Sequence, residues 1–468
     1  MAKYFLVLLL CLYVSTIPKL SAEEVAGFDD VAIQNAINAA EVGETIVFPQ
    51  GVYTVTKRIV PKSEQTLLGD GAVIFRAAPK ITTLIASVAV GDTTIQVADS
   101  SIYEVGNTIT PVRPGGGNAD IEVKVHFIVN IQGNSITVNR PFESSYESGA
   151  FVTNYFNVVE SGEPFTIDGL VFLGQRQLQV FSSWRRNRNI LGFEGLQVRN
   201  CRFENLPGDA IDAWGGNAII EDNVFTDLDA AGVHLSNDVD EEEDVIIRNN
   251  VFVRTNEKHL SAGHSEGAIT VSLRNNHIRV LNNQCFNIPA AFIGNFHVDM
   301  GDWTVSGNLV VNAERGFFRG SNNNNGPLPL AGVVFSSNTI LDSPLSVMDT
   351  LLPVEGFFLE GNRFIGSAIR LVDVFGIVMD NEIKVCEGVA IEIINGGVGE
   401  NGNLIDEGYC EASFTVGDMN LDGVVSLLDV NLFVDALSQA YYNPLADMNS
   451  DDQNSLLDVQ PFIDALNM

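Results

Sequence analysis

Positive charge is scarce in this sequence. Its 468 residues include 26 Lys and Arg against 59 Asp and Glu, which gives a formal net charge of −33. A surface this acidic argues against generalised binding to nucleic acid or to anionic membranes, because both would repel it. The length indicates two or three domains, or one long repetitive domain.

Long apolar runs are equally scarce. The clear one, Tyr4 to Val14, follows Lys3 and precedes small residues that end at Ala22. This is the layout of a secretory signal peptide cleaved after Ala22, with an uncleaved N-terminal anchor as the alternative. No later stretch reaches the roughly 20 apolar residues that span a bilayer. We therefore predict residues 1–22 as a signal peptide, and a secreted or surface-associated protein with no membrane span after cleavage.

The most frequent feature of the sequence is a short motif that is repeated between about residues 165 and 400. An apolar residue, two variable positions, Asn, a spacer and a second apolar residue recur at intervals of 19–33 residues. The Asn slot is filled by Asn223, Asn250, Asn283, Asn308, Asn338, Asn362 and Asn381, and earlier by Leu170 and Cys201; the second apolar position after Asn283 is Cys285.

Short alternating strands with a period in the twenties predict a solenoid, because a single coil cannot bury its apolar face alone. Stacked coils lie about 4.8 Å apart, and one Asn per coil at a bend could hydrogen-bond the Asn above and below. Chance Asn-rich turns in a β-sandwich are the alternative. With this repeat the chain resembles the right-handed parallel β-helix family of pectate-lyase-like proteins, which implies a mainly β fold.

The N-terminal region supports that resemblance. Ala32, Ile33, Ala36, Ile37 and Ala40 share one helical face, and a strand and a turn at residues 49–53 follow. This segment looks like the helical cap and first coil of carbohydrate-active β-helix proteins, and a cap would cover the exposed sheet edge of an open solenoid. We predict a β-helix over residues 23–410, interrupted at 86–152 by strand–turn–strand phrases that form a small β insertion.

Cysteine is also rare, since only four of the five cysteines lie beyond the predicted signal peptide, too few for a disulfide scaffold. Cys386 and Cys410 are 24 residues apart, one coil, so we predict that they stack at bridging distance. Cys201 and Cys285 are three coils apart and are expected to be buried hydrophobic residues.

In the β-helix family the strand about ten residues after the Asn bend forms the floor of a substrate groove. Asp212 lies eleven residues after Cys201, and His234 lies eleven after Asn223. We therefore expect Asp212 and His234 on adjacent coils, pointing outward and within hydrogen-bonding or one-water reach.

Aromatic and basic residues gather near the same positions. Trp184 and Trp214 fall fourteen and thirteen residues after their ladder positions, and four arginines occur within thirteen residues of a strongly acidic chain. Rings stack on sugar faces, and guanidinium groups match carboxylate or sulfate bidentately. The candidate substrate-binding residues are Arg176, Trp184, Arg185, Arg186, Arg188 and Trp214.

This combination predicts cleavage of an anionic, uronate or sulfated, polysaccharide. In a lyase, Arg or a further Ca²⁺ in the groove would neutralise the uronate and His234 would take the C5 proton. A hydrolase needs two carboxylates, for which Asp209 with Asp212 or Glu266 are the candidates. The candidate catalytic residues are His234, Asp212, Asp209, His264 and Glu266, the last two on a lengthened coil that should overhang this face.

Other interpretations remain open at this stage. The arginines could form a solvated ion-pair network, Asp212 and His234 a structural cross-coil hydrogen bond, and Trp214 could pack under the overhanging loop. The stretch GDAIDAWGG resembles a carboxylate segment of polygalacturonases, but their other catalytic motifs and those of pectate lyases are missing. The main rival to a lyase or glycoside hydrolase is a non-catalytic carbohydrate-binding or adhesive β-helix; a viral tailspike is a weaker rival.

An acidic phrase occurs twice near the end, at residues 417–430 and again 29 residues later. Oxygen-bearing side chains fall at loop positions 1, 3, 5, 9 and 12, and position 7 offers a backbone carbonyl, which is the oxygen-rich shell that Ca²⁺ prefers. The predicted ligands are Asp418, Asn420, Asp422, Val424, Ser426 and Asp429, then Asp447, Asn449, Asp451, Gln453, Ser455 and Asp458. Gly423 supplies the sharp turn in the first loop, whereas Asp452 stands there in the second.

An amphipathic helix is expected after each acidic loop. Two loop–helix units at this spacing resemble a dockerin domain, over residues 415–468, which implies two Ca²⁺ ions and a cohesin-like partner on a scaffold or surface protein. Leu427-Leu428 and Leu456-Leu457 replace the hydroxyl pairs of many dockerins, so an intramolecular or non-cohesin target is the alternative.

Overall fold

A computed structural model of the chain describes residues 22–466 apart from 114–125, 179–187, 238–243, 257–266, 274, 296–299, 315, 317, 321–329, 344, 347–353, 373, 386–388, 409–414, 420–423, 439–442, 444, 450 and 452. The predicted signal peptide, except for Ala22, therefore lies outside the described residues. The described chain is mainly β, with three short α-helices. None of the described helices is long and apolar enough to cross a membrane.

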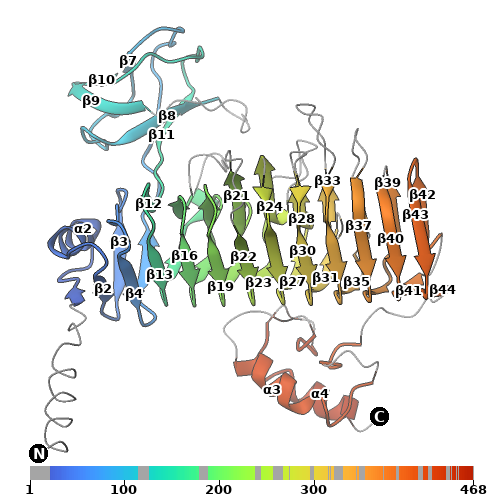
Figure 1. Ribbon diagram of the computed structural model, residues 1–468. Helices are drawn as coiled ribbons and strands as arrows, with labels where there is room; N and C mark the ends of the chain where they lie inside the picture. Colours follow the sequence, from blue (N-terminus) through green and yellow to red (C-terminus); the bar gives the residue numbers. More distant parts are fainter. Residues whose placement is uncertain are drawn as a thin grey trace, which may run out of the picture.

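Most strands stack into parallel sheets that the chain visits in turn (Figure 1). Sheet A runs β1(Ala22–Glu24), β2(Thr45–Phe48), β4(Thr66–Gly69), β13(Thr166–Asp168), β16(Gln197–Arg199), β19(Ile219–Glu221), β22(Val245–Arg248), β26(Ile278–Leu281), β30(Thr304–Ser306), β34(Val334–Ser336) and β37(Val354–Glu360), with β40(Val374–Met379) and β43(Gly397–Asn401) beyond β37. The start of β37 pairs with the short strand β33(Leu330–Ala331), and the sheet continues from there through β29(Met300–Gly301) to β25(Asn275–Asn276).

Two further sheets complete each coil. Sheet B runs β3(Val52–Val55), β5(Val73–Arg76), β14(Val171–Leu173), β17(Arg202–Glu204), β20(Val224–Thr226), β23(Val251–Val253), β27(Gln284–Ile288), β31(Leu309–Ala313), β35(Thr339–Leu341), β38(Arg363–Ile365), β41(Glu382–Val385) and β44(Leu404–Glu407). Sheet C runs β12(Val159–Ser161), β15(Ile190–Gly192), β18(Ile211–Ala213), β21(Val233–Asn237), β24(Gly267–Leu273), β28(Ala291–Asn295) and β32(Phe318–Gly320); β36(Leu345–Ser346), β39(Ile369–Val372) and β42(Ile391–Ile394) form a separate sheet in later coils. The repeated order A, B, C with parallel neighbours defines a parallel β-helix.

The predicted Asn ladder lies at the bend from sheet A to sheet B. The Asn223 side-chain amide donates to Asn250 Oδ1 over 3.0 Å, and Asn250 donates to Asn283 over the same distance. The ladder continues coil by coil to Asn381 and then to Asn403, a final member that the sequence analysis did not include.

A left-handed residue precedes each ladder position. Asn200, Asp222 and Asn249 have φ between 54° and 57° immediately before Cys201, Asn223 and Asn250. Asn and Asp tolerate this region because their short polar side chains hydrogen-bond locally, and Gly occupies it elsewhere, as at Gly307 with φ 68°. The two-residue bend thus reverses the chain and turns the next Asn inward.

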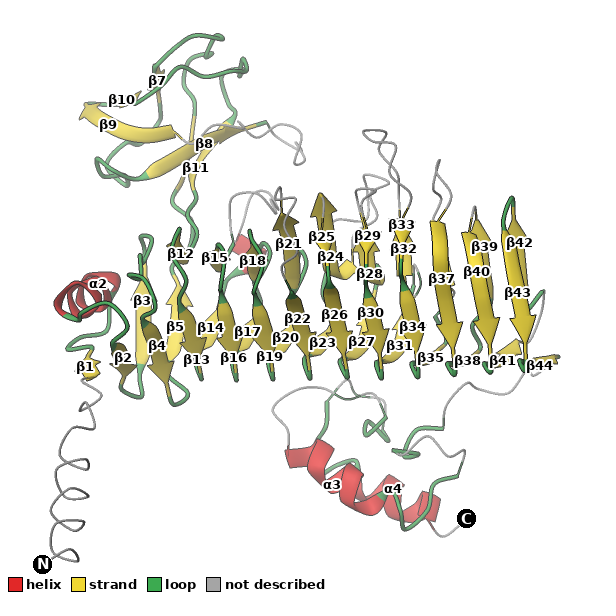
Figure 2. Cartoon of the chain, viewed as in Figure 1, coloured by secondary structure: helices red, strands yellow, loops and turns green. Residues whose placement is uncertain are grey.

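The interior is packed by aliphatic side chains and stacked rings. Phe172, Phe203, Phe225 and Phe252 lie in register on sheet B, with ring centroids 4.8–5.0 Å apart and planes within 7° of parallel. Helix α2(Asp30–Ala39) lies at the N-terminal end of the stack (Figure 2) and buries Ile33, Ala36 and Ile37 there. Asp29 caps it by accepting the Ala32 amide over 2.8 Å, so this end is closed as the apolar helical face predicts.

The insertion is a separate antiparallel unit that lies beside the early coils (Figure 1). Its strands β6(Ile81–Thr83), β11(Phe151–Asn154), β8(Thr108–Val112), β9(His126–Gln132), β10(Ser135–Val138) and β7(Thr94–Gln96) form one sheet in that order. Hydrogen bonds of 2.9 Å from Ile85 to Gln96 and from Ala98 to Thr83 join its two edge strands. The sheet therefore closes on itself around its own apolar core. Its strands begin at 81 and end at 154, slightly outside the predicted 86–152.

Two short helices follow the acidic phrases. Helix α3(Val430–Ser438) and helix α4(Val459–Leu466) pack through Phe433 and Phe462, whose rings stack with centroids 3.9 Å apart. They bury a small core of their own.

Cysteines occupy two of the interior positions. Cys201 and Cys285 are buried and unpaired, as expected. Burial raises the pKa of the Cys201 thiol to about 12 and that of Cys285 well above its usual value. Cys386 and Cys410 lie outside the described residues, so their disulfide remains a prediction.

Candidate functional site

Asp212 and His234 lie side by side on the outer face of sheet C. Asp212 on β18 is the register partner of His234 on β21. Their neighbours Ile211, Ala213 and Val233 belong to the solenoid core. Because side chains alternate along a strand, Asp212 and His234 point away from that core. This is the placement that the eleven-residue spacing predicts.

His234 is held by hydrogen bonds at both ring nitrogens. Its Nδ1 lies 3.1 Å from Asp209 Oδ2, and its Nε2 lies 2.5 Å from the hydroxyl of Ser272. Asp209 is itself fixed, because its other oxygen accepts the Ala231 amide over 3.1 Å. The carboxylate that hydrogen-bonds His234 is therefore that of Asp209, which precedes β18. Asp212 lies within one-water reach, because one ligand atom from each of Asp209, Asp212 and His234 lies within 4.8 Å of the others.

Asp212 is paired with a cation. The Nε of Arg188 contacts Asp212 Oδ2, and both side chains are buried. The contact is an ion pair, because neither Asp212 oxygen nor Arg188 Nε makes a hydrogen bond in the part of the chain that the structure describes. The guanidinium carbon of Arg188 lies 5.6 Å from the ring centroid of Trp214, which is 42% exposed. The site thus runs from a buried acid–imidazole cluster to an exposed aromatic ring.

Opposing influences act on the His234 pKa. Burial is the largest influence and would lower the pKa, but the charge of Asp212, the hydrogen bond from the imidazole to Asp209 and the charge of Asp209 together outweigh burial. The charge of Arg188 acts against the two carboxylates, yet the pKa of His234 is raised overall. The two carboxylates thus stabilise the protonated imidazolium relative to an imidazole in water.

The cluster is more buried than a groove floor would be. Asp212 is 0% exposed, Asp209 1% and His234 3%, whereas Ser272 is half-buried. Arg188 covers Asp212, and Asp209 and Ser272 enclose His234. These side chains therefore point outward, as the spacing predicts, but are enclosed by other polar groups.

Of the remaining candidate groove residues, the structure describes only Arg176. Arg176, in the short 3₁₀ helix Arg176–Leu178, lies 3.6 Å from the buried carboxylate of Asp229. Trp184, Arg185, Arg186, His264 and Glu266 lie outside the described residues, so their proposed roles stay predictions.

Ser272 is the member that sequence reasoning missed. The coil after Asn250 is lengthened, so counting eleven residues from Asn250 ends at 261, whereas the register partner of His234 is Thr270 on β24. The available signal was the alternation around Ile269 and Val271, whose apolar side chains enter the core and leave Thr270 and Ser272 outside.

The donors of this cluster match Ca²⁺ poorly. Asp209, Asp212 and His234 could offer one ligand atom each to a cation. Ca²⁺ takes 6–8 oxygen ligands, but here one donor is a nitrogen, and Arg188 already pairs with Asp212. A cation at this position would have to compete with the guanidinium group.

The C-terminal loops, in contrast, carry oxygen donors of the kind that Ca²⁺ prefers. Asp429 and Asp458, at loop position 12, are fully buried, and each accepts a 2.8 Å hydrogen bond from the backbone amide of the serine at position 9. In the second loop Asp451 N donates to Asp447 Oδ1 over 3.1 Å, which folds the acidic side chains inward. Asn420 and Asp422 lie outside the described residues; the other predicted ligands are Asp418, Val424, Ser426, Asn449, Gln453 and Ser455, all within them.

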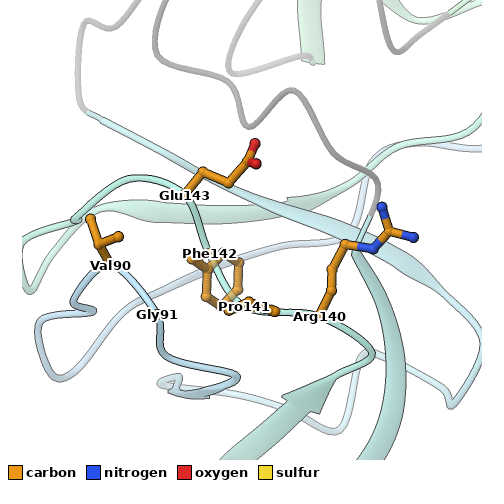
Figure 3. A pocket seen from close by; sticks show the side chains of 6 residues that line it. All are labelled: Val90, Gly91, Arg140, Pro141, Phe142 and Glu143. Carbon is orange, nitrogen blue, oxygen red and sulfur yellow. The ribbon is translucent and has the colours of Figure 1, made fainter.

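A shallow hollow of about 530 Å³ lies on the insertion (Figure 3). Val90, Pro141 and Phe142 form its apolar part, and the charged side chains of Arg140 and Glu143 extend from the same segment. The hollow belongs to a different unit from the His234 cluster.

Comparison with known proteins finds similarity among solved structures only. No protein-family model matches it, and no curated protein sequence matches it. Among solved structures it is similar to PfbA, a surface adhesin of Streptococcus pneumoniae, at 16% identity over 83% of this chain and 92% of that one, with a TM-score of 0.49. It is also similar to a polygalacturonase from Erwinia carotovora ssp. carotovora (12% identity, 80% and 91% covered, TM-score 0.38) and to the A-module of the mannuronan C-5 epimerase AlgE6 from Azotobacter vinelandii (13%, 81% and 96%, 0.37). Since these similarities are remote, the fold assignment rests on the strand pairing described above.

Proposed function

We propose that this chain is a carbohydrate-active protein that acts on an anionic polysaccharide at the outer face of sheet C. The observation that supports the proposal is the register pairing of Asp212 with His234, with Asp209 and Arg188 in direct contact with the two. An imidazole flanked by carboxylates and a guanidinium group is a set that transfers protons and stabilises negative charge.

Recognition of the substrate falls to the exposed end of the site. Trp214 is exposed on one side and lies beside Arg188, so a sugar ring stacked on the indole would bring its carboxylate or sulfate toward the guanidinium group. Arg185 and Arg186 follow Trp184 in sequence and are proposed to extend this basic surface.

Glycosidic cleavage by lysis would use His234 as the base that removes the C5 proton of a uronate. Cleavage by hydrolysis would use Asp209 and Asp212, whose ligand atoms approach within 4.8 Å. That separation is shorter than the roughly 6.5–9.5 Å between carboxyl groups that leaves room for a water in inverting glycosidases, so a hydrolase built on this pair would retain configuration.

The test is incubation of the full-length protein with uronate-containing and sulfated polysaccharides. Unsaturated products are followed by absorbance and new reducing ends by colorimetry. We expect product that is lost in His234→Ala and Asp212→Asn but kept in Asp168→Asn, a matched carboxylate on sheet A that pairs with Arg199 instead. Product formation that survives both site substitutions would sink the assignment.

A second candidate function is non-catalytic carbohydrate binding or adhesion. The observation that favours it is the enclosure of Asp212 and His234 among Arg188, Asp209 and Ser272, which also suits a structural cluster. Binding to a polysaccharide that yields no product with any member of the panel, and that weakens on Trp214→Ala, would support this candidate.

We further propose that residues 415–468 are a dockerin-like module that holds two Ca²⁺ ions and attaches the secreted β-helix to a cohesin-like surface or scaffold protein. The loops would hold the ions through Asp418, Asn420, Asp422, Val424, Ser426 and Asp429, and through Asp447, Asn449, Asp451, Gln453, Ser455 and Asp458. Calorimetry of the full chain that detects no Ca²⁺ uptake would rule out this module.

A further inference from the structure

Three side chains from successive coils of sheet C form a continuous hydrogen-bonded chain. The Asp209 carboxylate meets His234 Nδ1 at 3.1 Å, and His234 Nε2 meets Ser272 Oγ at 2.5 Å. In this order a carboxylate orients an imidazole, and the imidazole faces a hydroxyl, which is the arrangement that activates a serine for attack on an acyl group. The arrangement is recognised by geometry and not by spacing in sequence.

Burial is distributed as such a chemistry requires. Asp209 and His234 are enclosed, whereas Ser272 is half-buried. The acid and base are therefore protected from water, and the hydroxyl is the member of the chain with access to the outer face. Ile269 and Val271 anchor β24 in the core on either side of Thr270, which keeps Ser272 on the outer face.

Asp212 has a separate role in this arrangement. It does not hydrogen-bond the imidazole, but its charge favours the protonated form of His234, and neither of its oxygens has a hydrogen-bond partner among the described residues. It is placed to stabilise the imidazolium that forms when the imidazole takes the serine proton.

From this geometry we propose that Ser272 is the nucleophile of an acyl-transfer site, with His234 as its base and Asp209 as the orienting carboxylate, and that the site removes O-acyl groups from a polysaccharide. The acylated-sugar substrate rests on the proposed carbohydrate function; the serine nucleophile does not. Ser272 Oγ bonds to the ester carbonyl carbon and gives its proton to His234 Nε2. The ester C–O bond then breaks, and the sugar oxygen leaves with that proton. Water, deprotonated by His234, attacks the acyl group, the Oγ–C bond breaks, and Ser272 regains its proton, so one ester and one water yield one acid and one alcohol.

The experiment treats the full-length protein with a biotinylated fluorophosphonate, which reacts with activated serines, and locates the adduct by peptide mass spectrometry. We expect an adduct on Ser272 that is absent in Ser272→Ala and His234→Gln and forms at least 100-fold more slowly in Asp209→Asn, because the imidazole loses its orienting carboxylate. Ser306→Ala is the matched control, since Ser306 is a half-buried hydroxyl on β30 of sheet A, and it should label like the parent protein. Circular dichroism checks that each variant is folded.

A second arm measures acetate release from O-acetylated uronate polysaccharides. Ser272 labelling together with acetate release that Ser272→Ala abolishes supports the whole proposal. No adduct on Ser272, or an adduct that forms equally well in His234→Gln, overturns the nucleophile, and the glycosidic assay above then still stands on its own. Labelling without acetate release from any polysaccharide overturns the carbohydrate substrate while the activated serine stands.

Discussion

The carboxylate of Asp209 and the imidazole of His234 are joined over 3.1 Å although 25 residues separate them in the chain. Asp209 precedes β18 and His234 lies on β21, so the contact exists only because one coil is stacked on the next.

We predict that Asp209→Asn lowers the pKa of His234. The substitution removes a negative charge and an acceptor that both favour the imidazolium, and burial, which acts in the opposite direction, remains. Titration of the imidazole C–H resonances by NMR checks this, with Asp168→Asn as the control. An unchanged or raised pKa would contradict the described role of Asp209.

His234 should also make stability depend on pH. Because its pKa in the folded protein is raised above 6.5, folding binds its proton more tightly than the unfolded chain does. The stabilisation is therefore fully present below about pH 6.5 and is lost as the pH rises through the folded-state pKa. Urea unfolding of the parent and of His234→Gln at a series of pH values measures it, and the difference between the two should shrink toward alkaline pH. A difference that grows with pH would refute the sign.

The Asn ladder should carry substantial stability. Asn283→Ala removes the acceptor of both the backbone and the side-chain amide of Asn250. Each buried polar group left unpaired costs about 1–3 kcal/mol, so we expect a loss of about 2–5 kcal/mol in the free energy of unfolding. Gln284→Ala, at the adjacent half-buried position on β27, is the control and should cost far less.

Trp214→Ala should weaken polysaccharide binding about tenfold with little loss of stability. The ring is 42% exposed and lies over Arg188, so its removal deletes a stacking surface without opening the core. Affinity electrophoresis in gels containing polyuronate measures the change. Phe127→Ala, an exposed aromatic residue of the insertion, should bind like the parent protein.

Removal of one position-12 carboxylate should remove one Ca²⁺. Asp429→Ala and Asp458→Ala each delete a buried carboxylate that we propose as a Ca²⁺ ligand, so the number of ions bound in calorimetry of the full chain should fall from two to one in either variant. Asp435→Ala, on the exposed face of α3, serves as the control. Retention of two ions in both variants would mean that the loops bind no Ca²⁺ through these residues.

The sequence predicts the solenoid well because its signal is periodic and local. Each bend needs a residue that tolerates positive φ, followed by a residue whose side-chain amide reaches the coils on both sides. Asp222 and Asn223 meet these two requirements at adjacent positions of the sequence. The last member of the ladder is harder to predict from the sequence, because Asn403 lies in a coil whose strands are largely exposed and lack the apolar pattern.

The candidate site is predicted only in part, for a physical reason. The spacing from the bend places Asp212 and His234 because their coils are of ordinary length. Ser272 follows a lengthened coil, so its register depends on how β24 packs and not on a count of residues. Enclosure of the cluster depends on Arg188, whose ion pair with Asp212 comes from a long connection that no periodicity describes.

The ladder keeps nearly the same geometry while the amount of chain between its rungs changes. Successive members are 27, 33, 25, 30, 24, 19 and 22 residues apart, yet every side-chain link measures 2.8–3.1 Å. The additional residues therefore fall, in sequence, between a strand of sheet B and the next strand of sheet A. The length of these connections can therefore change from one coil to the next while the ladder keeps its geometry. The specificity of such a molecule can then evolve separately from its fold.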